Sequence, residues 1–337
     1  MALTILSVVF LALLVLGVPV AFSIGLAAVS TILYEGLPVA VVFQRMAAGM
    51  NVFSFLAIPF FIFAGELMLY GGIADRIVAF AKNLVGHIRG GLGMANVVSC
   101  TLFGGISGSP VADVSAMGAV MIPMMKREGY HADYAVNVTT HASLVGALMP
   151  TSHNMIIYSL AAGGKVSIAA LILAGLLPAL ILTLCNLGAA YYVARKRGYP
   201  AGTWPGWNAV WVALAGAVPG LFIVVIIITG ILSGVFTATE SAAIAVIYSL
   251  VLTIVVYRSM SLEKFLKAAK AVKTTGIVLL LIGISATFGY LISLYSVADL
   301  TGKALSTIST NPLVIFFLVN VILFLLGTFL DMAATIL

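Results

Sequence analysis

A polar, glycine-rich bend lies in the middle of a segment that is otherwise apolar enough for the core of a lipid bilayer. The bend runs from Gly104 to Asp113 and reads GGISGSPVAD. Backbone N–H and C=O groups cannot stay unpaired in lipid, so irregular chain at membrane depth occurs only where protein or a water-filled cavity surrounds it. In transporters such places hold ions and substrates. The bend therefore predicts a binding site inside a membrane protein.

The composition of the chain supports a membrane location. Hydrophobic residues make up 63% of the 337 residues and charged residues only 8%, and the mean hydropathy is +1.22. A soluble domain could not bury this much apolar surface. The formal net charge of +6 comes from Lys and Arg in short loops between apolar spans, a distribution typical of the positive-inside rule and not of nucleic-acid binding. We therefore expect an all-α, polytopic membrane protein.

The same order of segments occurs twice along the chain. The first copy consists of an apolar stretch, a short amphipathic segment, a span, a polar stretch and the long segment with the bend: residues 2–34, 38–49, 53–70, 71–91 and 92–125. The second copy consists of two spans, an amphipathic helix, a third span, a polar stretch and an interrupted apolar segment: residues 207–232, 242–257, 261–273, 276–295, 296–311 and 312 onward. The shared order predicts an internal repeat.

Charge predicts that the two copies have opposite orientations. Arg89 precedes and Lys126 follows residues 92–125, so both ends of this segment are expected to face the cytoplasm. As one straight helix the segment would be about 51 Å long, more than the ~30 Å hydrocarbon core, whereas two half-helices that meet at the bend fit. Counting the membrane crossings in the same way, we expect the segment after Pro312 to enter the membrane from the outside. The result is an inverted-topology repeat with two re-entrant helical hairpins, as in secondary transporters.

The inverted repeat also constrains residues 2–34, because two crossings are needed there to match the two spans of the second copy. A hairpin hinged at Gly17 to Pro19 satisfies this requirement, although each arm is only about 15 residues long. One long kinked helix is the alternative that length statistics favour. We favour the hairpin.

A second interruption lies in residues 134–162. Pro150 removes a helical hydrogen bond and frees nearby carbonyl groups, while Thr151, Ser152 and Asn154 supply further oxygen atoms. These residues predict a broken membrane helix. Broken helices and hairpin tips offer N–H groups to an anionic substrate and carbonyl and hydroxyl oxygens to Na⁺. The chemistry expected here is coordination and not bond breaking.

Four motifs distributed along the whole chain resemble the large permease subunit of tripartite ATP-independent periplasmic (TRAP) transporters, the DctM-like family. They are LAIPFFIFAGELM at 56–68, SGSPVAD at 107–113, GVFTATE at 234–240 and GTFLD at 327–331. The resemblance implies a Na⁺-coupled, elevator-type importer of small organic acids in the bacterial inner membrane. It also implies two partners, a small four-helix membrane subunit and a periplasmic substrate-binding protein. Family members usually continue beyond the second hairpin, so this chain is expected to be truncated at its C-terminus.

The resemblance also assigns residues to sites. One Na⁺ site would use Ser107, Gly108, Ser109, Thr151 and Ser152, and part of another would use Gly327, Thr328 and Asp331. Substrate would contact Ser109, Asp113, Ser152, Asn154 and Asp331. The chain departs from the family at the helix break, where it reads PTSHN at 150–154 in place of two prolines, a serine and apolar residues. The identity of the organic acid therefore stays open.

The repeat and the resemblance together predict a division of the chain into five parts. These are scaffold helices and an interfacial arm (1–91), a transport-domain hairpin and broken helix (92–165), an inter-repeat helix and loop (166–206), scaffold helices and arm of the second copy (207–275), and a transport-domain helix with an incomplete hairpin (276–337).

Several alternatives remain open from the residues alone. The small residues at the bend could serve close helix packing, and Asp113 and Asp331 could simply cap the helices that follow them. The stretch Gly105 to Gly108 has the Gly-x-Ser-Gly form of an intramembrane serine protease, with His141 or His153 available as a base. A passive channel would also need polar backbone at depth. Proton coupling is the alternative to Na⁺ within a transporter.

Overall fold

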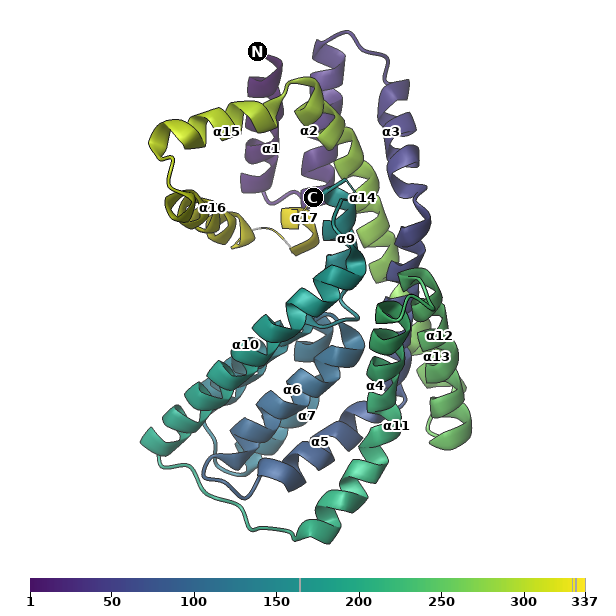
Figure 1. Ribbon diagram of the computed structural model, residues 1–337, viewed down its shortest axis with the longest axis vertical. Helices are drawn as coiled ribbons and strands as arrows, with labels where there is room; N and C mark the ends of the chain where they lie inside the picture. Colours follow the sequence, from purple (N-terminus) through teal and green to yellow (C-terminus); the bar gives the residue numbers. More distant parts are fainter. Residues whose placement is uncertain (164, 329, 331, 337) are drawn as a thin grey trace. The chain divides into compact units, whose positions relative to one another are not determined.

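The computed structural model describes residues 1–163, 165–328, 330 and 332–336, and these form helices joined by short connections (Figure 1). The helices of the first copy and of the segment after it are α1 Ala2–Val15, α2 Val20–Tyr34, α3 Ala40–Met50, α4 Ala57–Tyr70, α5 Ile73–Val85, α6 Gly91–Ser107, α7 Pro110–Arg127, α8 Ala132–Ser143, α9 His153–Ala161 and α10 Ile168–Lys196. Those of the second copy are α11 Trp207–Leu232, α12 Ala238–Val251, α13 Leu262–Ala269, α14 Ala271–Leu294, α15 Val297–Ile308, α16 Pro312–Gly327 and α17 Met332–Ile336.

Five helical segments in the described part of the chain are long and apolar enough to cross a membrane. They are Phe53–Tyr70, Ile168–Lys196, Trp207–Leu232, Ala238–Val256 and Leu262–Leu294. Three shorter apolar helices, α1, α2 and α6, accompany them. The predicted fold class is confirmed: the chain is an all-α, multi-pass membrane protein.

The order of elements follows the predicted repeat, with two refinements. The polar stretches at 71–91 and 296–311 contain helices, α5 and α15. Both helices are amphipathic, and their charged and hydroxyl residues lead a linear sequence count to mark each stretch as polar. The predicted hairpin in residues 2–34 is confirmed, because α1 and α2 pack against each other and Gly17 between them has φ +78°, a left-handed conformation that glycine adopts without strain.

The described chain divides into two compact units, Met1–Phe55 with Thr274–Leu337, and Leu56–Lys273. In the first unit, α14 packs against helices of the first copy. A Cβ atom on Gly25 of α2 would lie 3.4 Å from Ile284 of α14, and Thr287 of α14 donates a hydrogen bond to the Val42 carbonyl of α3 at 3.2 Å. The guanidinium of Arg45 stacks over the Tyr290 ring at 4.1 Å.

The second unit shows the reverse arrangement, in which helices of the second copy pack on a span of the first copy. Helix α4 of the first copy packs against α12 and α13 of the second, and the Phe63 and Phe265 rings meet edge to face at 6.2 Å. In both units, therefore, the amphipathic helix of one copy packs on the span of the other. The predicted five-part division concerns movement during transport and stays a prediction.

The two segments predicted to be re-entrant each contain two helices. Helices α6 and α7 pack along each other in the second unit, and only Gly108 and Ser109 between them are non-helical. The first hairpin is therefore formed as predicted, but its irregular part is shorter than the glycine-rich bend. In the first unit α16 and α17 are in contact. Asp331 lies outside the described residues.

Candidate functional site

The tip of the first hairpin (Ser107, Gly108 and Ser109) reverses the chain within two residues. Gly108 has φ +61° and ends α6, and Ser109 is extended with φ −132°. The Ser109 hydroxyl accepts a hydrogen bond from the Ala112 N–H at 3.4 Å, and Pro110 occupies the first position of α7. A serine N-cap followed by proline is a strong helix-start signal. The local sequence is sufficient to set this turn.

Asp113 points back toward the tip from the first turn of α7. The Ser107 hydroxyl donates a hydrogen bond to one carboxylate oxygen, Oδ1, and accepts one from the Ser109 N–H at 3.2 Å. The Asp113 side chain is completely buried. Its other oxygen, Oδ2, has no hydrogen-bond partner among the described residues. No described Lys or Arg forms an ion pair with Asp113, although a buried charge without a partner is strongly unfavourable.

The second interruption forms the predicted helix break (Met149 to Ser152). Helix α8 tightens into a 3₁₀ turn over Leu144–Leu148, Met149 is extended, and α9 begins at His153. The Thr151 hydroxyl donates a hydrogen bond to the Gly105 carbonyl of α6 at 3.1 Å. Ser152 and Asn154 are buried. Their Oγ and Oδ1 atoms find no hydrogen-bond partner in the part of the chain that the structure describes.

The tip and the break are in direct backbone contact, and we call this contact the tip–break site. A Cβ atom built on Gly108 would overlap the main chain of Thr151 and Ser152. The structure thus brings together Ser107, Gly108, Asp113, Thr151 and Ser152. Ser109 adjoins them and is half-buried, and Asn154 lies in the first turn of α9.

Two glycines that the sequence did not single out as site residues frame the carboxylate. A Cβ atom on Gly104 would lie 2.8 Å from Asp113 Oδ2, and one on Gly146 would lie 2.6 Å from the same atom. Gly65 of α4 approaches the tip from another side, where a Cβ atom would lie 3.4 Å from the Cα of Ser107. Glycine in an apolar run is the only sequence signal for these contacts, and close packing of membrane helices alone produces the same signal.

The chemistry of the tip–break site is that of an oxygen cluster. It contains hydroxyl groups, main-chain carbonyls and one carboxylate, and two of its buried oxygen atoms, Asp113 Oδ2 and Ser152 Oγ, have no described partner; the nearby Asn154 Oδ1 is a third such atom. No group of three or more His, Cys, Asp or Glu that could hold a metal occurs among the described residues, so a transition-metal site has no ligands there. A hydroxyl that donates its proton keeps lone pairs for a cation. The cluster therefore suits a small hard cation or a proton.

The residues predicted on the second hairpin have a different environment. Gly327 and Thr328 are exposed in the first unit. The Thr328 hydroxyl donates a hydrogen bond to the Phe324 carbonyl of α16 at 2.9 Å. Their roles stay predictions.

A buried hydrogen bond fastens α6 to α8 away from the tip. The Asn96 side-chain N–H of α6 donates to the Thr139 hydroxyl of α8 at 2.6 Å. The side-chain oxygen of Asn96, Oδ1, accepts a hydrogen bond from the Cys100 thiol at 3.4 Å. All three residues are fully buried. The bond therefore fixes the packing of the two helices that carry the tip and the break.

Thr139→Val is expected to lower the free energy of unfolding by roughly 1–3 kcal/mol, because it leaves the buried Asn96 amide with only the weak acceptor Met125 Sδ at 3.7 Å. Thr140→Val is the matched control: it lies next in the sequence, is exposed, and bonds only its own helix at the Val136 carbonyl. Thermal unfolding of the purified protein should separate the two variants. Equal melting temperatures would show that the Asn96 contact adds no stability.

Comparisons with known proteins identify the family. The family model described as "Tripartite ATP-independent periplasmic transporter, DctM component" matches residues 7–337. The chain is 38% identical over 332 residues to the uncharacterized protein YgiK of Salmonella typhimurium, covering 97% of this chain and 76% of the relative. It is 38% identical over 330 residues to the sialic acid TRAP transporter large permease protein SiaM of Vibrio cholerae, covering 97% and 77%. It is 31% identical over 342 residues to the C4-dicarboxylate TRAP transporter large permease protein DctM of Rhodobacter capsulatus, covering 97% and 78%.

The last two of these relatives are named as permease proteins of transporters. The chain is likewise not an enzyme, so the protease interpretation of Gly105 to Gly108 is not supported. The predicted resemblance, which rested on four short motifs, is confirmed over nearly the whole sequence. The chain belongs to the DctM family, the DctM component of tripartite ATP-independent periplasmic transporters.

Proposed function

We propose that this chain is the permease of a Na⁺-coupled secondary active importer of small organic acids. It would act in the bacterial inner membrane with a small four-helix membrane subunit, and a periplasmic binding protein would deliver the substrate. Membership of the DctM family supports this proposal, as do the two named permeases, whose substrates, sialic acid and C4-dicarboxylates, are carboxylic acids.

One observation carries the Na⁺ assignment. The tip–break site holds a fully buried carboxylate, Asp113, with one oxygen bonded to Ser107 and the other without a described partner. A cation bound beside it would offset the buried charge. We assign Na⁺ to the oxygens of Ser107, Gly108, Ser109, Thr151 and Ser152. Gly327 and Thr328 are proposed to contribute to a second Na⁺ site.

The substrate is proposed to bind next to the ion. Ser109, Asn154 and the Ser152 hydroxyl can donate hydrogen bonds to a carboxylate, and the N-terminal N–H groups of α7 and α9 add favourable partial charge. Asp113 and Asp331 are acceptors and would contact hydroxyl groups of the substrate.

The negative charge of Asp113 suggests how Na⁺ binding is coupled to transport. Without a cation, Asp113 would carry an uncompensated charge through a low-dielectric environment whenever the hairpin moves, and such movement is costly. With Na⁺ bound, the charge is offset. Na⁺ would therefore favour movement of the loaded hairpin in an elevator-like step.

Uptake into proteoliposomes that contain the permease, the small subunit and the binding protein tests this function. We expect substrate to accumulate when Na⁺ is higher outside and the pH is equal on both sides. Equal accumulation on a pH gradient without Na⁺ would contradict Na⁺ coupling.

Proton coupling is the second candidate, because a protonated Asp113 would also remove the buried charge. It predicts uptake that follows the pH gradient and is insensitive to Na⁺. The same vesicles distinguish the two candidates when the gradients are imposed one at a time.

Ser152→Ala should raise the half-saturating Na⁺ concentration for uptake at least threefold, because it removes one buried ligand oxygen. The control is Ser115→Ala, whose hydroxyl is exposed and bonds only the Val111 carbonyl of its own helix. Uptake measured over a Na⁺ series gives both values. An unchanged Na⁺ dependence in Ser152→Ala would remove Ser152 from the ion site.

A further inference from the structure

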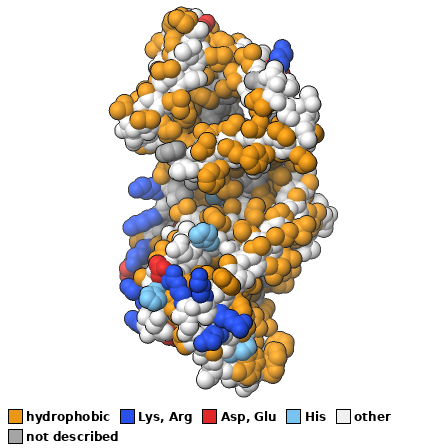
Figure 2. Space-filling view, turned by 90° about the vertical axis from the view of Figure 1, so that its left-hand side faces the viewer, with side chains coloured by type: hydrophobic (Ala, Val, Ile, Leu, Met, Phe, Trp, Pro, Cys, Tyr) orange, Lys and Arg blue, Asp and Glu red, His pale blue; other side chains and the backbone are white. Residues whose placement is uncertain are grey.

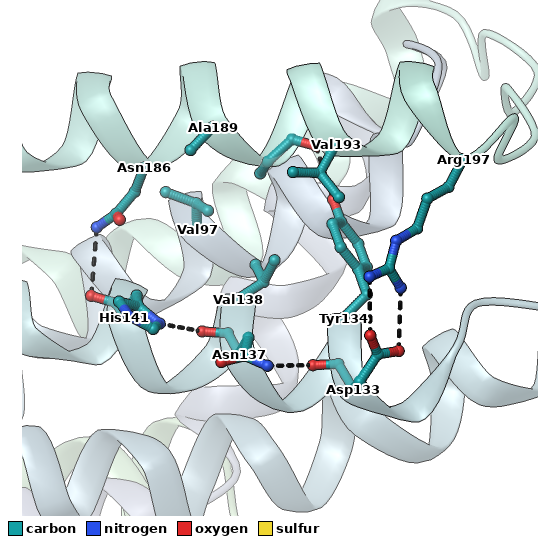
Figure 3. Close-up of a pocket in the computed structure, with 11 residues that line it drawn as sticks. Val97, Asp133, Tyr134, Asn137, Val138, His141, Asn186, Ala189, Val193 and Arg197 are labelled. Carbon is teal, nitrogen blue, oxygen red and sulfur yellow. Dashed lines mark hydrogen bonds and ion pairs between the residues drawn. The ribbon is translucent and has the colours of Figure 1, made fainter.

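A groove of about 340 Å³ runs along the outside of the second unit between α8 and α10 (Figure 3). Its lining is mostly apolar, with polar groups from α8 and from the two ends of the α10 wall. The lining residues are Val97, Asp133, Tyr134, Asn137, Val138, His141, Asn186, Ala189, Ala190, Val193 and Arg197. The groove is separate from the tip–break site and has no part in the proposed transport function.

A row of polar side chains follows the α8 side of the groove. Asp133, Asn137 and His141 are four residues apart and share one face of the helix. The Asn137 amide donates to the Asp133 carbonyl at 2.8 Å, a His141 ring nitrogen contacts the Asn137 carbonyl at 2.8 Å, and Asn186 donates to the His141 carbonyl at 3.2 Å. The row extends about 12 Å along the helix. Hydrocarbon covers such exposed polar groups poorly.

An ion pair closes the charged end of the groove. Arg197 forms a forked pair with the Asp133 carboxylate, at 2.8 Å and 3.0 Å. The hydrogen bond from Arg197 holds the pKa of Asp133 below its usual value. Because the pKa is lower in the folded protein, the pair forms fully above the ordinary Asp pKa and is lost only as the pH falls through the lowered value. It therefore persists at physiological pH.

Positive charge remains at this end after the pair is formed. Arg195 and Lys196 are exposed and have no ion pair among the described residues. Lys196 follows Ala189 by seven residues and so continues the same wall of the groove. Figure 2 shows Lys and Arg side chains gathered over the lower half of the face it displays, next to hydrophobic surface.

The face of α10 opposite the groove is apolar and exposed, so this helix is suited to contact with lipid. Leu177, Ile181 and Leu184 are 64%, 53% and 58% exposed. The positive-inside rule assigns the basic end of α10 to the cytoplasmic side, where anionic lipids are concentrated and basic pockets between membrane helices bind their head groups. In the groove itself, apolar lining (Val97, Val138 and Val193), the polar row and the excess positive charge match an acyl chain, an ester region and a phosphate.

We propose that this groove binds one anionic phospholipid of the cytoplasmic leaflet. The phosphate lies at Lys196 and Arg197, the glycerol ester groups lie over Asn137, His141 and Asn186, and an acyl chain runs along Val138 and Ala189. The lipid supplies the hydrogen bonds that hydrocarbon cannot give to the polar row.

Native mass spectrometry of the purified protein with added phosphatidylglycerol or phosphatidylcholine tests the proposal. We expect one tightly retained phosphatidylglycerol and at least fivefold weaker retention of phosphatidylcholine. Lys196→Gln should weaken phosphatidylglycerol retention at least threefold. Lys270→Gln, which removes an equally exposed lysine at the end of α13, should leave it unchanged. Both substitutions are at exposed positions, so we expect both variants to fold and lipid retention to be measurable for each.

A second variant tests the polar row without changing a lysine. His141→Leu should also weaken retention, with the melting temperature in lipid-free detergent unchanged. Equal retention of both lipids, equal effects of Lys196→Gln and Lys270→Gln, or displacement of the lipid by glycerol 3-phosphate at the same concentration would each overturn the proposal. So would loss of the bound lipid when the small membrane subunit is present, because that subunit would then cover the groove.

Discussion

Gly108→Ala is expected to reduce transport to less than a tenth of the wild-type rate while the protein still inserts and folds. Two effects act at this position. The φ of +61° costs an alanine about 1–2 kcal/mol, and the new Cβ atom would overlap the main chain of Thr151 and Ser152. Because backbone cannot rotate away as a side chain can, the tip and the break must separate. Such separation disrupts the site between them.

Gly129→Ala is the control variant that separates the overlap from the conformational strain. Gly129 has φ +84° in the loop after α7, and a Cβ atom added there would have nothing within 4 Å. It therefore has the same conformational strain without the overlap. Uptake by the two variants, normalised to protein in the membrane, is the measurement. If both variants transport equally well, the contact between tip and break is not needed for function.

Asp113→Asn is expected to have the second large effect, a fall in uptake of at least tenfold and a matching rise in the half-saturating Na⁺ concentration. The amide keeps the size of the side chain and an acceptor for Ser107, but it removes the charge. A tenfold change corresponds to about 1.4 kcal/mol, a modest value for a buried charge next to a cation. The tenfold rise in the half-saturating Na⁺ concentration is therefore a lower bound.

Asp75→Asn is the control variant, because it shows the effect of removing a carboxylate from the first turn of a helix where no ion site is proposed. Asp75 and Asp113 both lie in the first turn of a helix, in α5 and α7, but Asp75 is exposed. If Asp113 acts only by offsetting the positive partial charge at the N-terminus of its helix, the two variants should lose similar stability and neither should change the Na⁺ dependence. A shift in the Na⁺ dependence of Asp113→Asn alone supports the ion site.

The sequence predicted those parts of the fold that depend on local chemistry. Gly17 to Pro19 indicated the hinge between α1 and α2, a signal that acts within one turn of chain. The expectation that Asp113 caps the following helix was wrong, because Ser109 is the N-cap and α7 begins at Pro110. The apolar run lengths and the placement of basic residues then predicted the hairpin and the order of the repeat.

Contacts between distant segments could not be predicted in this way. Gly146 lies against the carboxylate of Asp113, 33 residues away in the sequence, and no local pattern distinguishes it from other glycines in apolar helices. The exchange of helices between the copies, with α13 on α4 and α3 on α14, is also a property of packing. The groove between α8 and α10 was missed because its two walls come from helices that are far apart in the sequence.

Equilibrium binding of radioactive Na⁺ to the purified permease tests the central claim most directly, because it needs no transport and no partner. The wild-type protein should bind Na⁺ saturably and without competition from K⁺. The double variant Ser107→Ala/Ser152→Ala should bind it at least fivefold more weakly, and Ser115→Ala should match the wild type. Equal Na⁺ affinity in the double variant and the wild type would contradict a Na⁺ site between the hairpin tip and the helix break.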